Sequence, residues 1–132
     1  MAEFGAAAKA RVLVVDDSSL VRLYYRSALE KAGFEVEQAI NGIEGMERVL
    51  SQRFDLVIVD INMPRMDGFT FVRSLRGGAN DIASLPALMI STEAETQDRA
   101  EARASGANFY LVKPVAEAEL VRHVCALTGV PL

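Results

Sequence analysis

The chain has 132 residues, of which 51% are hydrophobic and 24% charged, which suits one globular domain with its own core. Its net charge of −4 argues against a nucleic-acid or anionic-membrane surface, and no apolar run approaches the roughly 20 residues that span a bilayer. We therefore expect a cytoplasmic monomer that binds neither DNA nor membrane. The single cysteine, Cys125, suits a reducing compartment because it has no internal partner.

The first ten residues, MAEFGAAAKA, lack the basic leader and the long apolar stretch of a signal peptide. We therefore expect an N-terminal tail over residues 1–9, followed by one domain over residues 10–130. No internal repeat or low-complexity linker divides this domain.

Short apolar runs alternate with helical patterns along the domain. Runs rich in β-branched residues predict five strands, over residues 11–15, 34–39, 54–60, 87–91 and 108–112. The first helix follows the N-cap cluster Asp16–Ser19, extends to Ala32, and carries on one side Leu20, Leu23, Tyr24 and Leu29. The second helix begins near Asn41 and carries at helical spacing Ile43, Met46, Val49 and Leu50.

Three further helices complete the predicted pattern. The third follows the loop 62–68 and carries Phe71, Val72 and Leu75. The fourth, roughly Ala94–Ala104, has only alanines to bury, so we expect it to be among the less stable elements. The last follows Lys113 and Pro114 and carries Leu120, Val121, Val124 and Leu127.

Five strand–helix units in one short chain predict an α/β fold, a doubly wound five-stranded parallel sheet with five helices on its two faces. The strands are apolar without alternation, as expected for strands that are covered on both sides. In such folds, functional groups gather at the carboxyl ends of the strands.

Polar residues stand at four of these strand ends. Asp16 and Asp17 follow the first strand, Asp60 ends the third, Ser91 and Thr92 end the fourth, and Lys113 follows the fifth. Taken singly, several have plain alternatives: the first two aspartates and Ser91 are suited to capping helices, and Lys113 to a solvated loop. Asp60 is harder to explain structurally, because a carboxylate that closes a buried strand is costly without a partner.

The combination predicts a particular chemistry. Clustered carboxylates repel one another by about 4 kcal/mol per pair at 4 Å and an effective dielectric near 20, and a divalent cation relieves this repulsion. Oxygen-only ligands favour Mg²⁺, and the only histidine, His123, lies in the last predicted helix, away from these strand ends. An aspartate beside Mg²⁺ and a lysine is suited to accept a phosphoryl group.

Four motifs in order resemble the response-regulator receiver domain of two-component signalling, and most nearly its stand-alone chemotaxis type. They are VLVVDDSS (12–19), DLVIVDINMPRMDG (55–68), LMIS (88–91) and YLVKP (110–114), and the resemblance extends over about residues 10–128. It implies a flavodoxin-like sheet with strand order 2-1-3-4-5.

The resemblance also implies roles for individual residues. Asp60 is the phospho-acceptor, Asp17 a direct Mg²⁺ ligand, Asp16 a ligand through metal-bound water, and Asn62 a ligand through its backbone carbonyl. The residues that read out the phosphoryl group are the hydroxyl of Ser91, the ammonium of Lys113 and the ring of Tyr110. Tyr110 has the alternative of an ordinary packed aromatic, and Pro114 matches a proline that usually follows a cis bond.

Two features bear on rates. Thr92 stands where the family usually has alanine or glycine, and we expect its bulk to slow access to the site. Asn62 and Glu93 occupy positions that resemble those tuning phosphoryl lifetime, and we expect a short lifetime.

We therefore expect a stand-alone regulator that a sensor histidine kinase phosphorylates on Asp60, with no turnover as an enzyme. Because the chain ends just after the last helix, the output would be binding to a target, for example a flagellar motor, or to a phosphatase. The binding surface would be formed by helix 94–104, strand 108–112 and the last helix. The alternatives are a phosphate sink or relay intermediate, and an aspartyl-phosphate-forming phosphatase, although Asp16-Asp17-Ser18 lacks that enzyme's aspartate spacing.

Overall fold

The computed structural model describes residues 9–92 and 96–132. Within these ranges, five strands form one parallel sheet in the order β2-β1-β3-β4-β5, so the predicted fold class and strand order are confirmed. The strands are β1 (Arg11–Val15), β2 (Glu35–Ala39), β3 (Leu56–Asp60), β4 (Ala87–Ser91) and β5 (Phe109–Val112).

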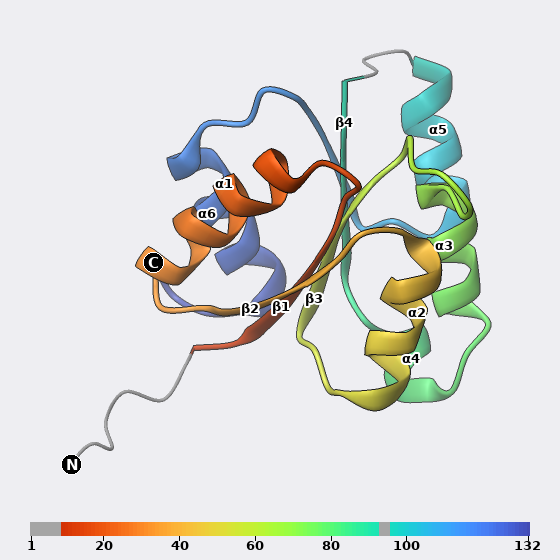
Figure 1. Ribbon diagram of the computed structural model, residues 1–132, viewed down its shortest axis with the longest axis horizontal. Coiled ribbons are helices and arrows are strands. Elements are labelled where there is room, and N and C mark those ends of the chain that lie inside the picture. The colour runs from red at the N-terminus through yellow and green to blue at the C-terminus, as the bar shows by residue number, and fades with distance from the viewer. Residues whose placement is uncertain (1–8, 93–95) are drawn as a thin grey trace.

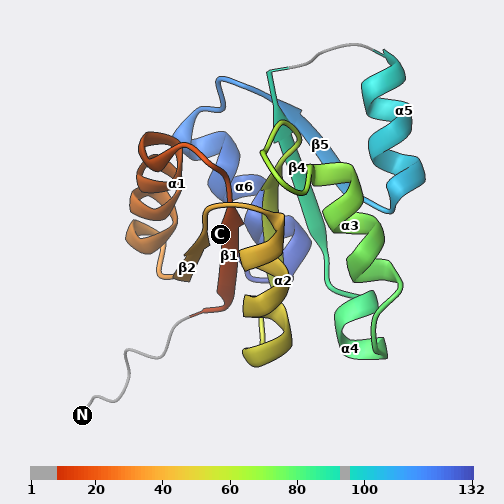
Figure 2. The same cartoon turned by 45° about the vertical axis from the view of Figure 1, so that its right-hand side comes forward.

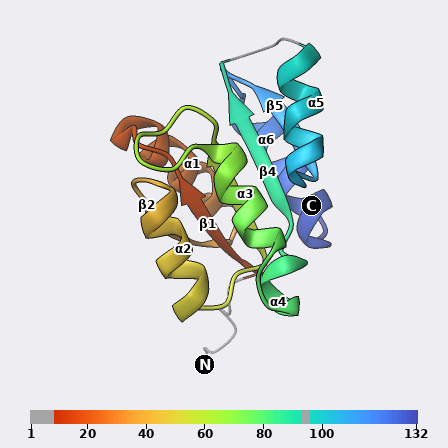
Figure 3. The same ribbon diagram turned by 90° about the vertical axis from the view of Figure 1, so that its right-hand side faces the viewer.

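The same ranges contain six helices, one more than predicted. They are α1 (Ser19–Lys31), α2 (Gly42–Ser51), α3 (Gly68–Arg76), α4 (Asn80–Ala83), α5 (Thr96–Ser105) and α6 (Glu117–Thr128). The additional helix, α4, has four residues, which is too short to show a hydrophobic period. Helices α1 and α6 cover one face of the sheet, and α2, α3 and α5 cover the other (Figures 1 and 3). None of these helices is both long and apolar enough to cross a bilayer.

The sheet separates two hydrophobic clusters, one under each helical layer. Alternate residues of each central strand enter opposite clusters: Leu13 and Val15 of β1 pack on one side, and Val12 and Val14 on the other. Every residue of β3 and β4 is buried, as the continuous apolar runs predicted. Because Val15 pairs with Val59 in register, the residues that follow them, Asp16 and Asp60, emerge side by side at the same rim.

The predicted packing side of α1 is wrong. Leu20 and Leu23 are 77% and 59% exposed, whereas the helix buries Tyr25, Ala28 and Leu29. At about 100° per residue, nine positions place Leu29 about 180° from Leu20, so these leucines cannot share one face. The helix packs on the arc that includes Ala28, where a small side chain lets it approach the sheet.

The prediction for α2 is confirmed for Val49 and for the partly buried Met46, and is wrong for Ile43 and Leu50. Ile43 and Leu50 are 39% and 68% exposed, and the buried residues are Gly42, Gly45 and Val49. A Cβ atom on Gly45 would lie 2.9 Å from the ring of Phe71, closer than such contacts occur. The helix therefore packs through glycines, which a hydrophobicity pattern does not register.

The loop between β3 and α3 contains a strained backbone position. Arg65 has φ +76°, the left-handed region that a non-glycine residue occupies at a cost of roughly 1–2 kcal/mol. Because asparagine tolerates this region better, Arg65→Asn should raise the free energy of unfolding by about 0.5–1 kcal/mol in urea titrations. Arg53→Asn, at an exposed position with negative φ, is the matched control and should change stability little. Equal effects at both positions would contradict the prediction.

Candidate functional site

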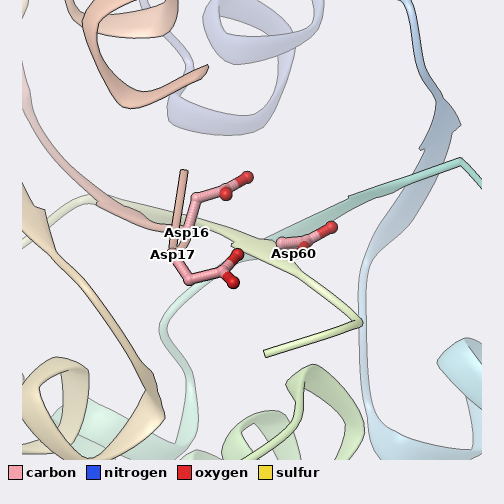
Figure 4. A group of neighbouring side chains, drawn as sticks. All are labelled: Asp16, Asp17 and Asp60. Carbon is pink, nitrogen blue, oxygen red and sulfur yellow. The ribbon is translucent and has the colours of Figure 1, made fainter. Parts of the chain in front are cut away.

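Three carboxylates meet at the carboxyl rim of the sheet. Asp16 and Asp17 follow β1, and Asp60 is the last residue of β3; one oxygen from each lies within 4.8 Å of the other two (Figure 4). Asp60 is 7% exposed and Asp16 2%, while Asp17 is open to solvent. The predicted convergence of these residues is therefore observed.

The two members of the β1 pair are held differently. One oxygen of Asp16 accepts a hydrogen bond from the backbone N–H of Ser18 at 2.9 Å, and the other lies 3.3 Å from the ammonium of Lys113. The cap of α1 is Ser18, whose side chain accepts from the N–H of Val21, so the aspartates are not its N-cap. Both oxygens of Asp16 thus have partners within the protein, whereas the carboxylate of Asp17 faces solvent.

The ammonium of Lys113 lies beside two of the three carboxylates. Its Nζ atom lies 3.3 Å from Oδ1 of Asp60 and 3.3 Å from Oδ2 of Asp16. Its backbone N–H donates to the carbonyl of Ser91 at 2.8 Å, which extends the β4–β5 pairing past the end of β5. The peptide between Lys113 and Pro114 is cis, as predicted.

Burial raises the pKa of Asp60 from 3.8 to about 6, because the charged form loses hydration at the buried end of β3. Lys113 opposes this shift, and the negative charges of Asp16 and Asp17 add to it. Three carboxylates and one ammonium leave a formal charge of −2 once Asp60 is ionised.

This donor set fits a divalent cation that prefers oxygen. Carboxylates dominate the cluster, and no thiolate or imidazole accompanies them among the described residues. Each of the three carboxylates offers one oxygen that could hold such a cation.

The structure locates all but one of the remaining residues that were predicted for the site. Ser91 is fully buried at the end of β4, and Thr92 after it is exposed. Tyr110 is buried on the edge strand β5, with the guanidinium carbon of Arg99 5.1 Å from its ring centroid, so both predicted readings of its role remain predictions. Asn62 is exposed at the rim, and Glu93 lies outside the described residues, so their effect on phosphoryl lifetime also stays a prediction.

Two adjacent tyrosines near the site were missed by the sequence analysis as functional candidates. The hydroxyl of Tyr24 donates to the carbonyl of Val115 at 2.9 Å, two residues after Lys113. Tyr25 is 3% exposed, and burial together with Asp16 and Asp60 raises the pKa of its hydroxyl. Their apolar rings fit an ordinary helix pattern, and no local signal marks a partner 91 positions away.

The sequence profile described as the response regulator receiver domain matches residues 12–125, and thus includes all four of the polar strand ends. The chain belongs to this family. The receiver domain predicted from the motifs is therefore confirmed.

Several curated relatives of this receiver domain are regulators of transcription by name. It is 43% identical over 117 residues to the transcriptional regulatory protein PrrA of Mycobacterium leprae, and 35% identical to the DNA-binding dual master transcriptional regulator RpaA of Synechocystis. The alignments cover 89% of this chain but only 49% and 48% of those proteins. The chain therefore spans about half the length of the curated relatives it matches.

This finding corrects the predicted partners. The exclusion of DNA rested on the acidic charge of the domain, and the relatives show that a receiver domain of this kind occurs in DNA-binding regulators. The charge of one domain does not decide what the protein that contains it binds. We therefore withdraw the prediction that the target is a motor or a phosphatase and that the protein does not bind DNA.

Solved structures agree on the fold of the receiver domain. The chemotaxis protein CheY4 of Vibrio cholerae superposes with a TM-score of 0.85 at 38% identity, covering 89% of this chain and 98% of that one. A putative response regulator from Chloroflexus aurantiacus superposes with a TM-score of 0.86 at 30% identity, covering 91% and 98%. Relatives of both kinds, transcriptional and chemotactic, thus share this domain.

Proposed function

We propose that this receiver domain is a Mg²⁺-dependent switch that accepts a phosphoryl group on Asp60 from a histidine kinase. The observation that carries the proposal is the grouping of Asp60 with Asp17, Asp16 and Lys113 at one rim of the sheet. A buried aspartate with a purely structural role would be expected to cap a helix or accept a local hydrogen bond. Asp60 instead ends a buried strand beside two more carboxylates.

The reaction follows from the positions of these groups. A carboxylate oxygen of Asp60 forms the bond to phosphorus while the bond between phosphorus and the donor's imidazole nitrogen breaks. The imidazole leaves with that electron pair and takes a proton from water. Lys113, already within 3.3 Å of Oδ1 of Asp60, neutralises charge on the transferred oxygens. Bound Mg²⁺ would supply further neutralisation of that charge.

The new phosphoryl group would bias a conformational equilibrium. It adds roughly −1.5 to −2 charge, and a charge-assisted hydrogen bond from Ser91 is worth roughly 1.5–3 kcal/mol. Moving an equilibrium from 1:99 to 99:1 needs about 5.5 kcal/mol. The hydrogen bond from Ser91 supplies less than this, so Lys113 and a bound partner must contribute the remaining free energy. We expect the response on the surface formed by α5, β5 and α6, where residues 97–105 of α5 bury only the side chains of Ala102 and Ser105.

A second output has specific support. PrrA and RpaA are about twice as long as the matched region and are named as transcriptional regulators, which supports control of transcription as the output of phosphorylation. The similarity to the chemotaxis protein CheY4 supports a role in a chemotaxis pathway as the alternative, and this remains a prediction.

Acetyl phosphate provides the direct test. With Mg²⁺, the chain should take up one phosphoryl group per molecule, and excess EDTA should abolish the uptake, because three crowded carboxylates disfavour an anionic donor. Mass spectrometry of the intact protein and of its peptides measures stoichiometry and position. Label on another residue, or repeated turnover of a phosphoester as expected for a phosphatase, would overturn the proposal.

A further inference from the structure

We infer that Tyr24 is a positioning residue, which holds the backbone after β5 so that Lys113 stays beside Asp60. This inference rests on the proposed phosphoryl transfer and adds to it a residue outside the family motifs. It starts from one contact, the hydrogen bond of 2.9 Å from the Tyr24 hydroxyl in α1 to the carbonyl of Val115.

The carbonyl of Val115 ends the short segment that carries Lys113 and lies before α6. The first backbone bond of α6 runs from the N–H of Leu120 to the carbonyl of Ala116, so the helix does not use the carbonyl of Val115. On the other side, the N–H of Lys113 is bound to the carbonyl of Ser91. Lys113 is therefore the start of a three-residue segment whose two ends are each fixed by one hydrogen bond, and Tyr24 supplies the second.

Packing fixes only one end of this segment, because Val115 is buried in the cluster under α1 and α6 whereas Pro114 is exposed and Lys113 half-buried. A hollow of about 300 Å³ lies between α1 and the segment, lined by Leu20, Val21, both tyrosines and residues 113–115. Leu20, at its edge, is 77% exposed. Because Lys113 borders on this hollow, its position depends on its two ion pairs and on how firmly the backbone is anchored.

Helix α1, which carries Tyr24, and α6, which follows the segment with Val115, lie next to each other on one face of the sheet (Figures 1 and 2). A second link between them, the ion pair between Lys31 and Glu117 at 3.4 Å, is exposed and lies near the opposite end of α1. It offers a matched control, because its removal loosens α1 from α6 without touching the segment that carries Lys113.

Tyr24→Phe removes the hydroxyl and keeps the ring. We expect phosphoryl uptake from acetyl phosphate to slow by roughly fivefold, about 1 kcal/mol, since about 1.4 kcal/mol corresponds to a tenfold change in rate. In that reaction an oxygen of Asp60 bonds to phosphorus and acetate leaves with the electron pair of the broken bond. Lys31→Met should leave the rate unchanged.

Two further measurements separate positioning from general destabilisation. In a double-mutant cycle with Lys113→Ala, Tyr24→Phe should have no additional effect, because the lysine through which it acts is gone. NMR relaxation of the Lys113 ammonium in the unphosphorylated protein should show greater motion in Tyr24→Phe than in wild type or Lys31→Met.

Each outcome has a distinct meaning. Unchanged motion of the Lys113 ammonium overturns the inference whatever the phosphorylation results are, as does an equal loss of rate with and without Lys113. Greater motion with an unaltered rate shows that the anchor does not serve the transfer, and also overturns it. If the wild type takes up no phosphoryl group, the proposed function fails, while the NMR comparison still decides whether Tyr24 positions Lys113.

Discussion

Asp60→Asn should abolish phosphoryl incorporation from acetyl phosphate and at the same time raise the free energy of unfolding of the metal-free protein at pH 7.5. The first effect follows because an amide cannot serve as the nucleophile that the carboxylate provides. Intact-protein mass spectrometry with Mg²⁺ present measures it. Label retained in the variant would place the acceptor elsewhere.

The gain in stability follows from the environment of the carboxyl. Burial keeps its pKa at about 6 in the folded protein against 3.8 otherwise, so the ionised form at pH 7.5 is disfavoured by folding. The shift corresponds to about 3 kcal/mol, and screening by solvent at the rim reduces the expected gain to about 1–2 kcal/mol. Asparagine has the same size and carries no charge, and Lys113 keeps Asp16 as a partner.

The sign of the pH dependence is fixed by the same shift. Because the folded pKa lies above the unfolded one, the contribution of Asp60 to stability is complete below about pH 4 and is lost as the pH rises through 6. Urea titrations between pH 4 and 8 should show this decline in the wild type and a smaller one in Asp60→Asn. The exposed Asp81→Asn is the control, and should change neither labelling nor the pH profile. A destabilised Asp60→Asn would mean that the carboxylate serves the fold.

Arg76→Met should lower the free energy of unfolding by about 3 kcal/mol. The guanidinium donates to the backbone carbonyls of Ala83, Leu85 and Gly106 and to the side-chain oxygen of Asn108, at 2.6–3.1 Å. Burial lowers the pKa of Arg76, in keeping with its half-buried position. Methionine preserves much of the apolar stem but leaves three carbonyls without this donor, each at a cost of about 1 kcal/mol.

Arg73→Met gives the matched comparison for Arg76. Arg73 also lies in the last turn of α3 but is exposed, and its replacement should cost less than about 0.5 kcal/mol. Because Arg76 joins segments away from the carboxyl rim, its variant should still take up a phosphoryl group in the absence of urea. Similar midpoints of urea unfolding for the two variants would contradict the account.

The sheet could be predicted from sequence because its evidence is local and repeated. Each central strand is a short apolar run, and a polar residue such as Asp60 or Ser91 marks its carboxyl end. Parallel pairing then brings these ends to one rim, so the main members of the site could be predicted with the sheet. What each residue does there, and whether the output is transcription or motility, has no comparable local signal.

The helices were predicted less well, for identifiable reasons. In α2, the close approach at Gly45 depends on the ring of Phe71, which belongs to another helix. In α1, exposed Leu20 contributes as much to a hydrophobic pattern as buried Leu29. The partners of Arg76 and Tyr24 depend on tertiary geometry, and charge or ring type alone does not indicate which carbonyl a donor reaches.

The order in which the site's residues leave the ribosome has a consequence for its activity. Asp16 and Asp60 belong to the first half of the chain, whereas Lys113 follows β5, a strand at the edge of the sheet. On the proposed function, a nascent or partly folded chain therefore has the proposed acceptor, Asp60, before it has the ammonium of Lys113 beside it. Competence for modification on Asp60 would then report that this domain has folded through β5, and a kinase would discriminate against partly folded molecules without a separate checkpoint.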